Sequence, residues 1–245
     1  MNDHFVIIVP ARSGSTRLPN KPLAMINGRS LISRVIDLAK SSKATDLYIA
    51  TDSDEIKQHV ESSGTNVVMT SSNHISGMDR IAEAATILDL DSDTSIVNLQ
   101  GDEPFIPVEI INQLPTFLSE EIPISTACIK FTKNMDLNSP NEVKVTRSLS
   151  KRAMYFSRSV IPNPFTADYQ NYLKHLGIYS YKNKTLQKLS KLDPSSNEEI
   201  EKLEQLRFLD NGFNIYVQDY ECKAPIGIDT AQDLEAAIRF AKNND

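Results

Sequence analysis

The sequence is poor in tryptophan and cysteine. It has 245 residues with no tryptophan and only two cysteines, Cys128 and Cys222, which are too few and too far apart for a metal motif or a disulfide framework. We therefore expect reduced thiols. No apolar run approaches the roughly 18 to 20 residues that a bilayer-spanning helix needs. The residues before the first apolar run form no basic leader segment, so we expect a cytoplasmic protein with no membrane partner.

Positive charge is also scarce overall. The net charge is −6 and the second half has only scattered Lys and Arg, which argues against a nucleic-acid partner. The 40% of hydrophobic residues is enough for a substantial core, either as one large α/β domain or as two small ones.

One stretch departs from this acidic balance. The run from Phe5 to Val9 has the length and β-branched content of a buried strand, and we expect Pro10 to end it. The basic loop that follows carries Arg12, Arg17 and Lys21 among small hydroxyl and glycine residues. Such a loop offers cations and backbone N–H groups to a polyphosphate. The sequence therefore predicts an anion-binding site here.

Strands and helices alternate after this loop. Helical spacing of apolar residues predicts helices at about 30–42, 54–62 and 78–88, and short apolar runs predict strands at 47–50, 67–69 and 95–100. Alternation of this kind is typical of a mainly parallel sheet with helices on both faces, and such sheets bind ligands at the carboxyl ends of their strands.

The segments that follow these strands would therefore meet at one edge. They are residues 10–21, 51–52, 74–80 and 101–104. One is basic, and another carries an acid pair behind a glycine. Mg²⁺ prefers one or two carboxylates together with phosphate oxygens and water, so we expect Mg²⁺ to accompany an anionic ligand at this edge.

The pattern changes from about residue 122. Short strand-like runs at 124–131, 143–146, 154–157 and 176–181 predict an antiparallel portion, and residues 162–172 form a long loop. A helix is predicted at 197–209, with Ile200, Leu203, Leu206 and Leu209 as its core stripe. A strand at 214–218 and a helix at 231–241 close the chain.

Motifs distributed along the whole chain carry a family resemblance. They are Ile8 to Arg12, Ser15 to Pro19, Lys21 to Leu23, Ala50 to Asp52, Ser76-Gly77 with Arg80, Asn98 to Pro104, Pro140-Asn141, Val143 to Val145, Tyr155 to Arg158, His175 to Tyr179, Leu203 to Arg207 and Gly227 to Thr230. Each is weak alone, but their joint order resembles the 3-deoxy-manno-octulosonate (Kdo) cytidylyltransferases from end to end.

This resemblance implies a single-domain, three-layer nucleotidyltransferase (Rossmann-like) α/β fold with a mainly parallel central sheet. A nucleotide-binding core would cover about 1–122 and 223–245, and an antiparallel sugar-binding and dimerisation portion would cover about 123–222 of a homodimer. The implied reaction transfers CMP from CTP to the anomeric hydroxyl of an eight-carbon ulosonic acid and releases pyrophosphate, for lipopolysaccharide inner-core biosynthesis.

The resemblance also implies roles for individual residues. The implied catalytic residues are Arg12, Lys21, Asp102 and Asp229, with Asp102 and Asp229 as Mg²⁺ ligands. The implied nucleotide-binding residues are Pro10, Ala11, Arg12, Arg17, Lys21, Ser76, Arg80, Gln100 and Asp102. The implied sugar-binding residues are Arg158, His175, Tyr179, Glu204 and Gln205.

Several of these residues have an ordinary structural alternative. An Asp in a Gly-Asp-Glu-Pro turn is by itself more often a helix cap than a metal ligand. Glu204 and Gln205 have acidic neighbours that suggest a solvated helix face, and His175 could equally be a core histidine bonded to backbone. We interpret Arg34 and Arg207 as surface or ion-pair residues.

Two segments depart from the family pattern. Met78 stands where the family commonly has a threonine that could contact the ligand or cap the helix. The segment from Asn163 to Asp168 lacks the tryptophan and the Asp-Arg pair of many relatives. Some relatives act on the 8-amino-3,8-dideoxy form of the sugar, whose ammonium would need an acceptor. Asp168 is a candidate for that role.

Other functions stay open on sequence grounds. A nucleotidyltransferase for another nonulosonic acid or for a sugar 1-phosphate would share the fold and the basic loop, but it would not account for the motifs from Pro140 onward. A nucleotide-binding module without catalysis is a further alternative. The joint presence of Arg12, Lys21, Asp102 and Asp229 argues against it.

Overall fold

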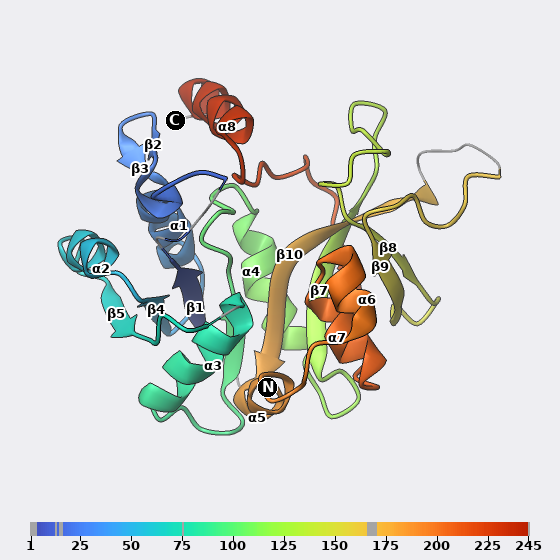
Figure 1. The fold of residues 1–245 in the computed structure, drawn as a ribbon, viewed down its shortest axis with the longest axis horizontal. Coiled ribbons are helices and arrows are strands. Elements are labelled where there is room, and N and C mark those ends of the chain that lie inside the picture. Colours follow the sequence, from blue (N-terminus) through green and yellow to red (C-terminus); the bar gives the residue numbers. More distant parts are fainter. Residues whose placement is uncertain (1–3, 13, 15–16, 75, 166–170, 245) are drawn as a thin grey trace.

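In the described part of the chain, nine strands form one mixed sheet (Figure 1). The computed structural model describes residues 4–12, 14, 17–74, 76–165 and 171–244. The sheet strands are β1 (Phe5–Ala11), β4 (Asp46–Thr51), β5 (Asn66–Met69), β6 (Ser95–Asn98), β7 (Ile124–Lys130), β8 (Lys144–Arg147), β9 (Ala153–Ser157), β10 (Leu173–Lys182) and β11 (Ile215–Asp219). A small separate hairpin consists of β2 (Met25–Ile26) and β3 (Arg29–Ser30).

The order across the sheet is β11-β7-β10-β6-β1-β4-β5. Strands β6, β1, β4 and β5 are mutually parallel, as predicted for the first half of the chain. Strand β10 runs antiparallel to β6 and β7, and β8 and β9 form an antiparallel extension beside it. The predicted α/β class, with a mainly parallel sheet and an antiparallel part, is confirmed.

Helices cover both faces of the sheet (Figure 1). The α-helices of the described chain are α1 (Leu31–Lys40), α2 (Asp54–Glu61), α3 (Gly77–Ile87), α4 (Val108–Gln113), α5 (Asn183–Leu189), α6 (Ser196–Glu201), α7 (Gln205–Asp210) and α8 (Ala231–Asn244). Two short 3₁₀ helices are η1 (Lys21–Leu23) and η2 (Leu114–Phe117). Helices α1, α2, α4 and α8 share one core with Ile7 and Val9 of β1, whereas α3, α5 and α7 share the other with Val6 and Ile8. This alternation produces three layers.

The prediction that Pro10 ends the first strand is wrong. Strand β1 continues to Ala11, and its pairing with β4 includes Pro10 opposite Ala50. On the other side, pairing with β6 stops at Ile8. A proline is tolerated in a strand where a neighbouring strand has ended, because no ladder partner there needs its missing N–H. The strand therefore ends, and the basic loop begins, two residues later than expected.

The prediction of one helix at 197–209 is also wrong. A left-handed residue, Lys202 (φ 53°), separates α6 from α7, and a capping box from Ser195 to Glu198 begins α6. Ile200 is 80% exposed, so it is not part of a core stripe, whereas Leu203 and Leu206 are buried. The break at Lys202 changes the direction of the chain, so the 3.6-residue period does not carry through it.

The interpretation of two arginines needs correction. Arg34 is buried and donates from Nε and Nη2 to the carbonyl oxygen of Ile26. Arg207 is also buried, with its Nη2 2.6 Å from Oε1 of Glu198, so the ion-pair interpretation is right and the surface one is wrong. Within the described part of the chain, no helix has the length and apolar character to cross a membrane.

Candidate active site

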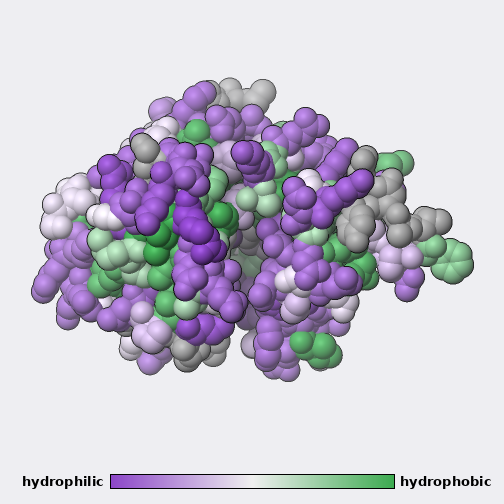
Figure 2. Space-filling view, turned by 90° about the horizontal axis from the view of Figure 1, so that it is seen from above, coloured by the Kyte–Doolittle hydropathy of each residue, from purple (hydrophilic) through white to green (hydrophobic). Residues whose placement is uncertain are grey.

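Two cavities lie side by side at the edge where β1, β4 and β6 end. Seen from above that edge, the molecule is hollowed between its two halves (Figure 2). The first cavity has a volume of about 550 Å³ and the second about 640 Å³. Both are lined by Gln100, Asp102 and Asp229. These three residues therefore stand at the junction between the two cavities.

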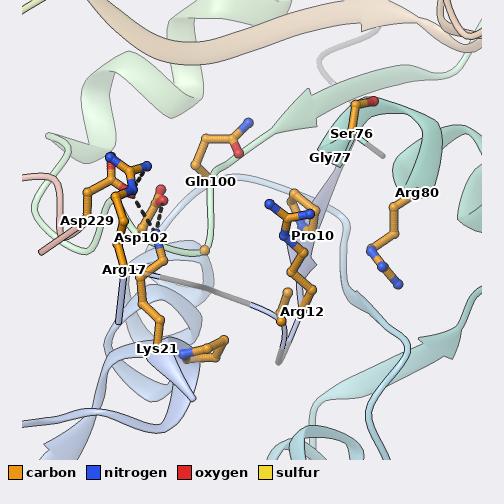
Figure 3. Close-up of a pocket in the computed structure, with 14 residues that line it drawn as sticks. Pro10, Arg12, Arg17, Lys21, Ser76, Gly77, Arg80, Gln100, Asp102 and Asp229 are labelled. Carbon is orange, nitrogen blue, oxygen red and sulfur yellow. Dashed lines mark hydrogen bonds and ion pairs between the residues drawn. The ribbon is translucent and has the colours of Figure 1, made fainter. Parts of the chain in front are cut away.

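The first cavity gathers the residues that the sequence predicted for nucleotide binding (Figure 3). Its lining is Pro10, Ala11, Arg12, Gly14, Arg17, Lys21, Pro22, Ser76, Gly77, Arg80, Gln100, Gly101, Asp102 and Asp229. Loops after β1, β5 and β6 supply most of them, as expected for the carboxyl ends of parallel strands. Four cationic side chains face two carboxylates, so the cavity suits a polyanion.

Glycines allow the walls of this cavity to approach one another. A Cβ atom on Gly101 would lie 2.8 Å from the carbonyl oxygen of Pro10, which real structures do not tolerate. A Cβ on Gly77 would lie 3.4 Å from the Pro10 ring. The loop after β6 therefore packs directly on the end of β1, because residue 101 has no side chain.

Local hydrogen bonds bring the two acids together. The backbone N–H of Ile228 donates to the carbonyl oxygen of Asp102 at 2.9 Å, which ties the segment before α8 to the loop after β6. Thr230 and Asp233 exchange hydrogen bonds at the start of α8, and Oδ2 of Asp233 also accepts from the backbone N–H of Asp229. This arrangement fixes Asp229 beside Asp102.

A lysine ammonium lies between the two carboxylates (Figure 3). Nζ of Lys21 is 2.6 Å from Oδ2 of Asp102 and 2.9 Å from Oδ1 of Asp229, and Arg17 approaches Asp229 at 3.2 Å. Burial works against the charge of Lys21, but Asp102 and Asp229 outweigh it and raise the pKa of the ammonium. Burial likewise favours neutral Asp229, but Lys21 and Arg17 outweigh it and lower the pKa of that carboxyl.

This pair of carboxylates also fits a divalent cation. Among the described residues no cluster of three His, Cys, Asp or Glu side chains could by itself hold a metal ion. Asp102 and Asp229 nevertheless converge on one positive charge, and two carboxylates completed by phosphate oxygens and water are the set that Mg²⁺ prefers. The helix-cap alternative does not describe Asp102, since its side chain bonds Lys21.

Ser76 and Arg80 line the far end of the first cavity. The Ser76 side chain accepts from the backbone N–H of Asp79 and caps α3. Arg80 is buried, and its guanidinium donates to Asp52 at 2.8 Å and to the Thr70 hydroxyl at 2.6 Å. Met78 lies in the core, so the capping hydroxyl comes from Ser76 and the methionine leaves the helix start intact.

Acidic residues predominate in the lining of the second cavity. Seven acidic side chains line it, and Lys174 is the only lysine or arginine among the described lining residues. The acids are Asp102, Glu103, Asp136, Glu142, Glu204, Asp229 and Asp233. Lys174 itself is paired with Glu142 at 2.5 Å. Four of the five predicted sugar-binding residues are brought here, namely His175, Tyr179, Glu204 and Gln205.

His175 is a buried core residue and also lines the second cavity, so both interpretations made from the sequence apply to it. Burial lowers the pKa of the imidazole to about 3, so the ring is neutral at physiological pH. Its Nε2 lies 3.0 Å from the Thr126 hydroxyl, and its ring packs against Phe156 and Tyr179. His175 is therefore a core histidine, but its hydrogen-bond partner is a side chain and not the expected backbone group. The same residue also forms part of the cavity wall.

The solvated-face interpretation of Glu204 and Gln205 is wrong. Gln205 is buried, and Oε1 of Glu204 is a buried atom without a hydrogen-bond partner among the described residues. Burial raises the pKa of Glu204 to about 7, while the neighbouring Ser76 hydroxyl partly offsets this. The break at Lys202 turns these two side chains inward, which the helical period could not indicate.

Sequence reasoning missed Glu103 as a site residue. Burial, reinforced by the charge of Asp102, raises the pKa of its carboxyl to about 8. A Cβ on Gly227 would lie 2.9 Å from Oε1 of Glu103, so the glycine leaves room for this acid at the cavity wall. The acid pair after Gly101 was the available signal.

The structure does not bring Arg158 to either cavity lining among the described residues. Its side chain donates to the carbonyl oxygens of Pro140, Glu201 and Lys202. Its positive charge still contributes to the lowered pKa of Asp229, after the larger effects of burial, Lys21 and Arg17. Asp168, the candidate ammonium acceptor, lies outside the described residues.

The chain is similar to known cytidylyltransferases over most of its length. A family model described as Cytidylyltransferase matches residues 6–219. A 3-deoxy-manno-octulosonate cytidylyltransferase of Polynucleobacter necessarius subsp. necessarius is 44% identical over 236 residues, covering 94% of this chain and 93% of that protein. The enzyme of the same name from Francisella tularensis subsp. novicida is 44% identical over 242 residues, covering 96% and 97%.

A solved structure agrees with these relatives. The structure of CMP:2-keto-3-deoxy-manno-octonic acid synthetase complexed with CTP is similar to this one with a TM-score of 0.89. The two sequences are 36% identical, and the match covers 98% of this chain and 99% of the other. Sequence and fold therefore point to one family over almost the full length.

Proposed function

Since the chain belongs to the 3-deoxy-manno-octulosonate cytidylyltransferase family, we propose that it transfers CMP from CTP to the anomeric hydroxyl of Kdo and releases pyrophosphate. The observation that carries this proposal is the junction of the two cavities at Gln100, Asp102 and Asp229. A nucleotide in the first cavity and a sugar in the second would meet there. The product would serve lipopolysaccharide inner-core biosynthesis.

The residues of the first cavity would bind the nucleotide. Arg12 and Lys21, with Arg17 beside Lys21, face the space where a triphosphate would lie, and they can neutralise the charge that grows during attack on the α-phosphorus. Pro10, Ala11, Ser76, Arg80 and Gln100 would enclose the rest of the nucleotide. Phosphoryl transfer of this kind needs mainly positioning and electrostatics, so no side-chain nucleophile is required.

Asp102 and Asp229 would hold Mg²⁺ when it is bound, and the ion would lower the pKa of the sugar hydroxyl and neutralise phosphate charge. Lys21 would then be free to turn its ammonium from the carboxylates toward the phosphates, since all three groups lie at the edge of the first cavity. The same two acids border the second cavity, where they would orient the attacking hydroxyl.

The second cavity would select the acceptor. His175, Tyr179, Glu204 and Gln205 offer donors and acceptors for sugar hydroxyls, and Lys174 offers a cation for the carboxylate. Oε1 of Glu204, a buried atom of this wall without a hydrogen-bond partner among the described residues, favours a second candidate acceptor, the 8-amino-3,8-dideoxy form, because its ammonium could donate to that oxygen. Asp168 as the partner of that ammonium stays a prediction.

The decisive experiment incubates the protein with CTP, Mg²⁺ and a panel of acidic sugars and measures pyrophosphate. We expect release with Kdo or its 8-amino form, and the ratio of kcat/KM for the two will identify the preferred acceptor. A preference for the 8-hydroxy sugar would reject the 8-amino proposal. Turnover only with another nonulosonic acid or a sugar 1-phosphate would reject both acceptors, and turnover with none would favour a nucleotide-binding module.

We also propose that the protein is a cytoplasmic homodimer. Three exposed apolar side chains, Leu149, Met154 and Phe165, belong to the antiparallel portion. Such side chains are typical of an interface between copies. Sedimentation equilibrium should yield about twice the chain mass of 27.4 kDa, and Met154→Lys should lower it. A monomeric wild-type protein would contradict this part.

A further inference from the structure

A carboxylate of α3 binds two points of the 70–74 loop, which follows β5. Oε2 of Glu83 accepts from the backbone N–H of Ser71 at 2.8 Å and lies 2.5 Å from Nε2 of His74. Burial works against the charge of Glu83, but the bonds from His74 and Ser71 outweigh it and lower the pKa of the carboxyl. An ionised carboxylate only accepts hydrogen bonds, so Nε2 of His74 is the donor. One side chain therefore fixes both ends of the segment from Ser71 to His74.

Arg80 makes a third connection between this loop and α3. Its Nη1 donates to the hydroxyl of Thr70 at 2.6 Å, and its Nη2 donates to Oδ2 of Asp52 at 2.8 Å. Arg80 and Glu83 are three positions apart on α3, so their side chains leave the same face of the helix. The 70–74 loop is therefore bonded to one helix face at three places, and Thr70 is at once part of the loop and an acceptor for Arg80.

This helix face borders the end of the first cavity that lies away from the ionic group. Ser76 and Arg80 line that end, and Figure 3 shows them on the opposite side from Lys21 and Asp229. The proposed function places the triphosphate beside Lys21, which leaves the ribose and base for the end at Ser76 and Arg80. Neither His74 nor Glu83 is among the described residues that line this cavity, so any effect on the nucleotide acts through their neighbours.

We infer that His74 and Glu83 are positioning residues for the nucleoside end of the first cavity, and that they set the affinity for the ribose and base of CTP. This inference rests on the proposed function. Loss of the His74–Glu83 bond releases the loop that carries Thr70, so the guanidinium of Arg80 loses a fixed acceptor. The phosphate end is independent of this loop, because Arg12 follows β1 and Lys21 belongs to η1.

Calorimetric titration of His74→Leu with CTP and, separately, with inorganic triphosphate tests this inference in the presence of Mg²⁺. We expect the Kd for CTP to rise about tenfold, as for the loss of a hydrogen bond to a charged group, and the Kd for inorganic triphosphate to stay within about twofold. In turnover, KM for CTP should rise while KM for the acidic sugar does not. An unchanged Kd for CTP would overturn the inference, and so would an equal loss of affinity for both ligands.

Two further variants test whether the hydrogen bond itself is responsible. His74→Gln places an amide N–H near the position of Nε2, so it should keep the Kd for CTP within about threefold of the wild-type value. Affinity as low as in His74→Leu would overturn the inference. Glu83→Ala releases Ser71 as well as His74 and should weaken CTP binding more than His74→Leu. A smaller loss would contradict it, and if Glu83→Ala does not fold, the two His74 variants decide, since that side chain is partly exposed.

His59→Leu is the matched control. Nε2 of His59 lies 2.8 Å from the Ser30 hydroxyl and 3.0 Å from the Ser33 hydroxyl, and none of these three residues lines the first cavity. Its loss should leave both Kd values unchanged, and a selective loss of CTP affinity there would overturn the inference. A wild-type protein that binds CTP but turns over no acidic sugar would reject the proposed function alone, whereas one that binds no CTP would reject both.

Discussion

The two cavities share one border and differ in almost everything else. The first is lined by four lysine or arginine side chains and two acids, and most of its cations come from one continuous loop. The second is lined by seven acids and, among the described residues, one lysine, and its walls come from five separate parts of the chain, residues 100–103, 134–143, 174–179, 203–205 and 224–233. Nucleotide binding can therefore be read from a short motif, whereas acceptor choice depends on how distant segments pack.

The shared border explains why the two opposite charges can coexist. Lys21, Asp102 and Asp229 form a compact ionic group between them, in which the negative charge of the second cavity is partly neutralised by the cations of the first. Four experiments test this difference between the two cavities, and each has an expected change in activity, stability, affinity or KM.

The largest effect is expected at the border itself. Asp102→Asn and Asp229→Asn should each reduce Mg²⁺-dependent pyrophosphate release by about 10³-fold or more, because each removes a carboxylate that serves both cavities. Thermal unfolding should change little, since both side chains are partly exposed. Asp37→Asn, at an exposed ion pair with Arg29, is the control. Near-normal activity in either variant would remove that residue from the metal site.

The acid-rich side should make stability depend on pH through Glu204. Its pKa is raised to about 7 in the fold, so between its ordinary value and about 7 the folded protein binds the proton more tightly than the unfolded chain. Stability from this group is present at low pH and is lost as pH rises through about 7, by at most about 3 kcal/mol. Glu204→Gln should remove that decline in the urea unfolding free energy. Parallel pH profiles for both proteins would contradict the assignment.

The cation-rich side should respond to loss of one charge. Arg12→Met is expected to raise the Kd for CTP by about 10 to 100-fold, as for the loss of one hydrogen bond to a charged group, and to reduce the salt dependence of binding. Calorimetric titration with CTP at two salt concentrations measures both. The matched variant Arg239→Met removes an exposed arginine of α8 that pairs only weakly with Glu235. Equal affinities in the two variants would argue against a triphosphate contact.

The smallest effect is expected at Lys174, the one lysine among the described residues that line the second cavity. Lys174→Met should raise KM for the acidic sugar by about fivefold and leave KM for CTP unchanged, because Glu142 already neutralises part of its charge. Glu142→Gln should act in the opposite direction by freeing the ammonium. If Lys174→Met instead improves turnover of the 8-amino sugar, the excess of acids is what selects the acceptor.

Local signals predicted much of the fold correctly. The helices predicted at 30–42 and 54–62 are present as α1 and α2, which Ser30 and Ser53 cap, and apart from the small β2–β3 hairpin the order of strands and helices up to β6 is the predicted one. The short helices α4 and α5 were missed because six or seven residues contain too few turns to show a period. The prediction that Pro10 ends the first strand was wrong because strand pairing, and not residue type alone, decides where a proline is tolerated.

The site divides in the same way. The basic loop, the acid pair after Gly101 and the parallel arrangement that brings strand ends to one edge could be predicted, because they depend on neighbouring residues and on periods of 2 or 3.6 residues. Three features of the site could not be predicted: Asp229 pairs with Lys21 across 208 positions, the turn at Lys202 directs Glu204 inward, and Arg158 donates to backbone carbonyl oxygens. Those outcomes depend on packing between segments far apart in the chain, which no local pattern encodes.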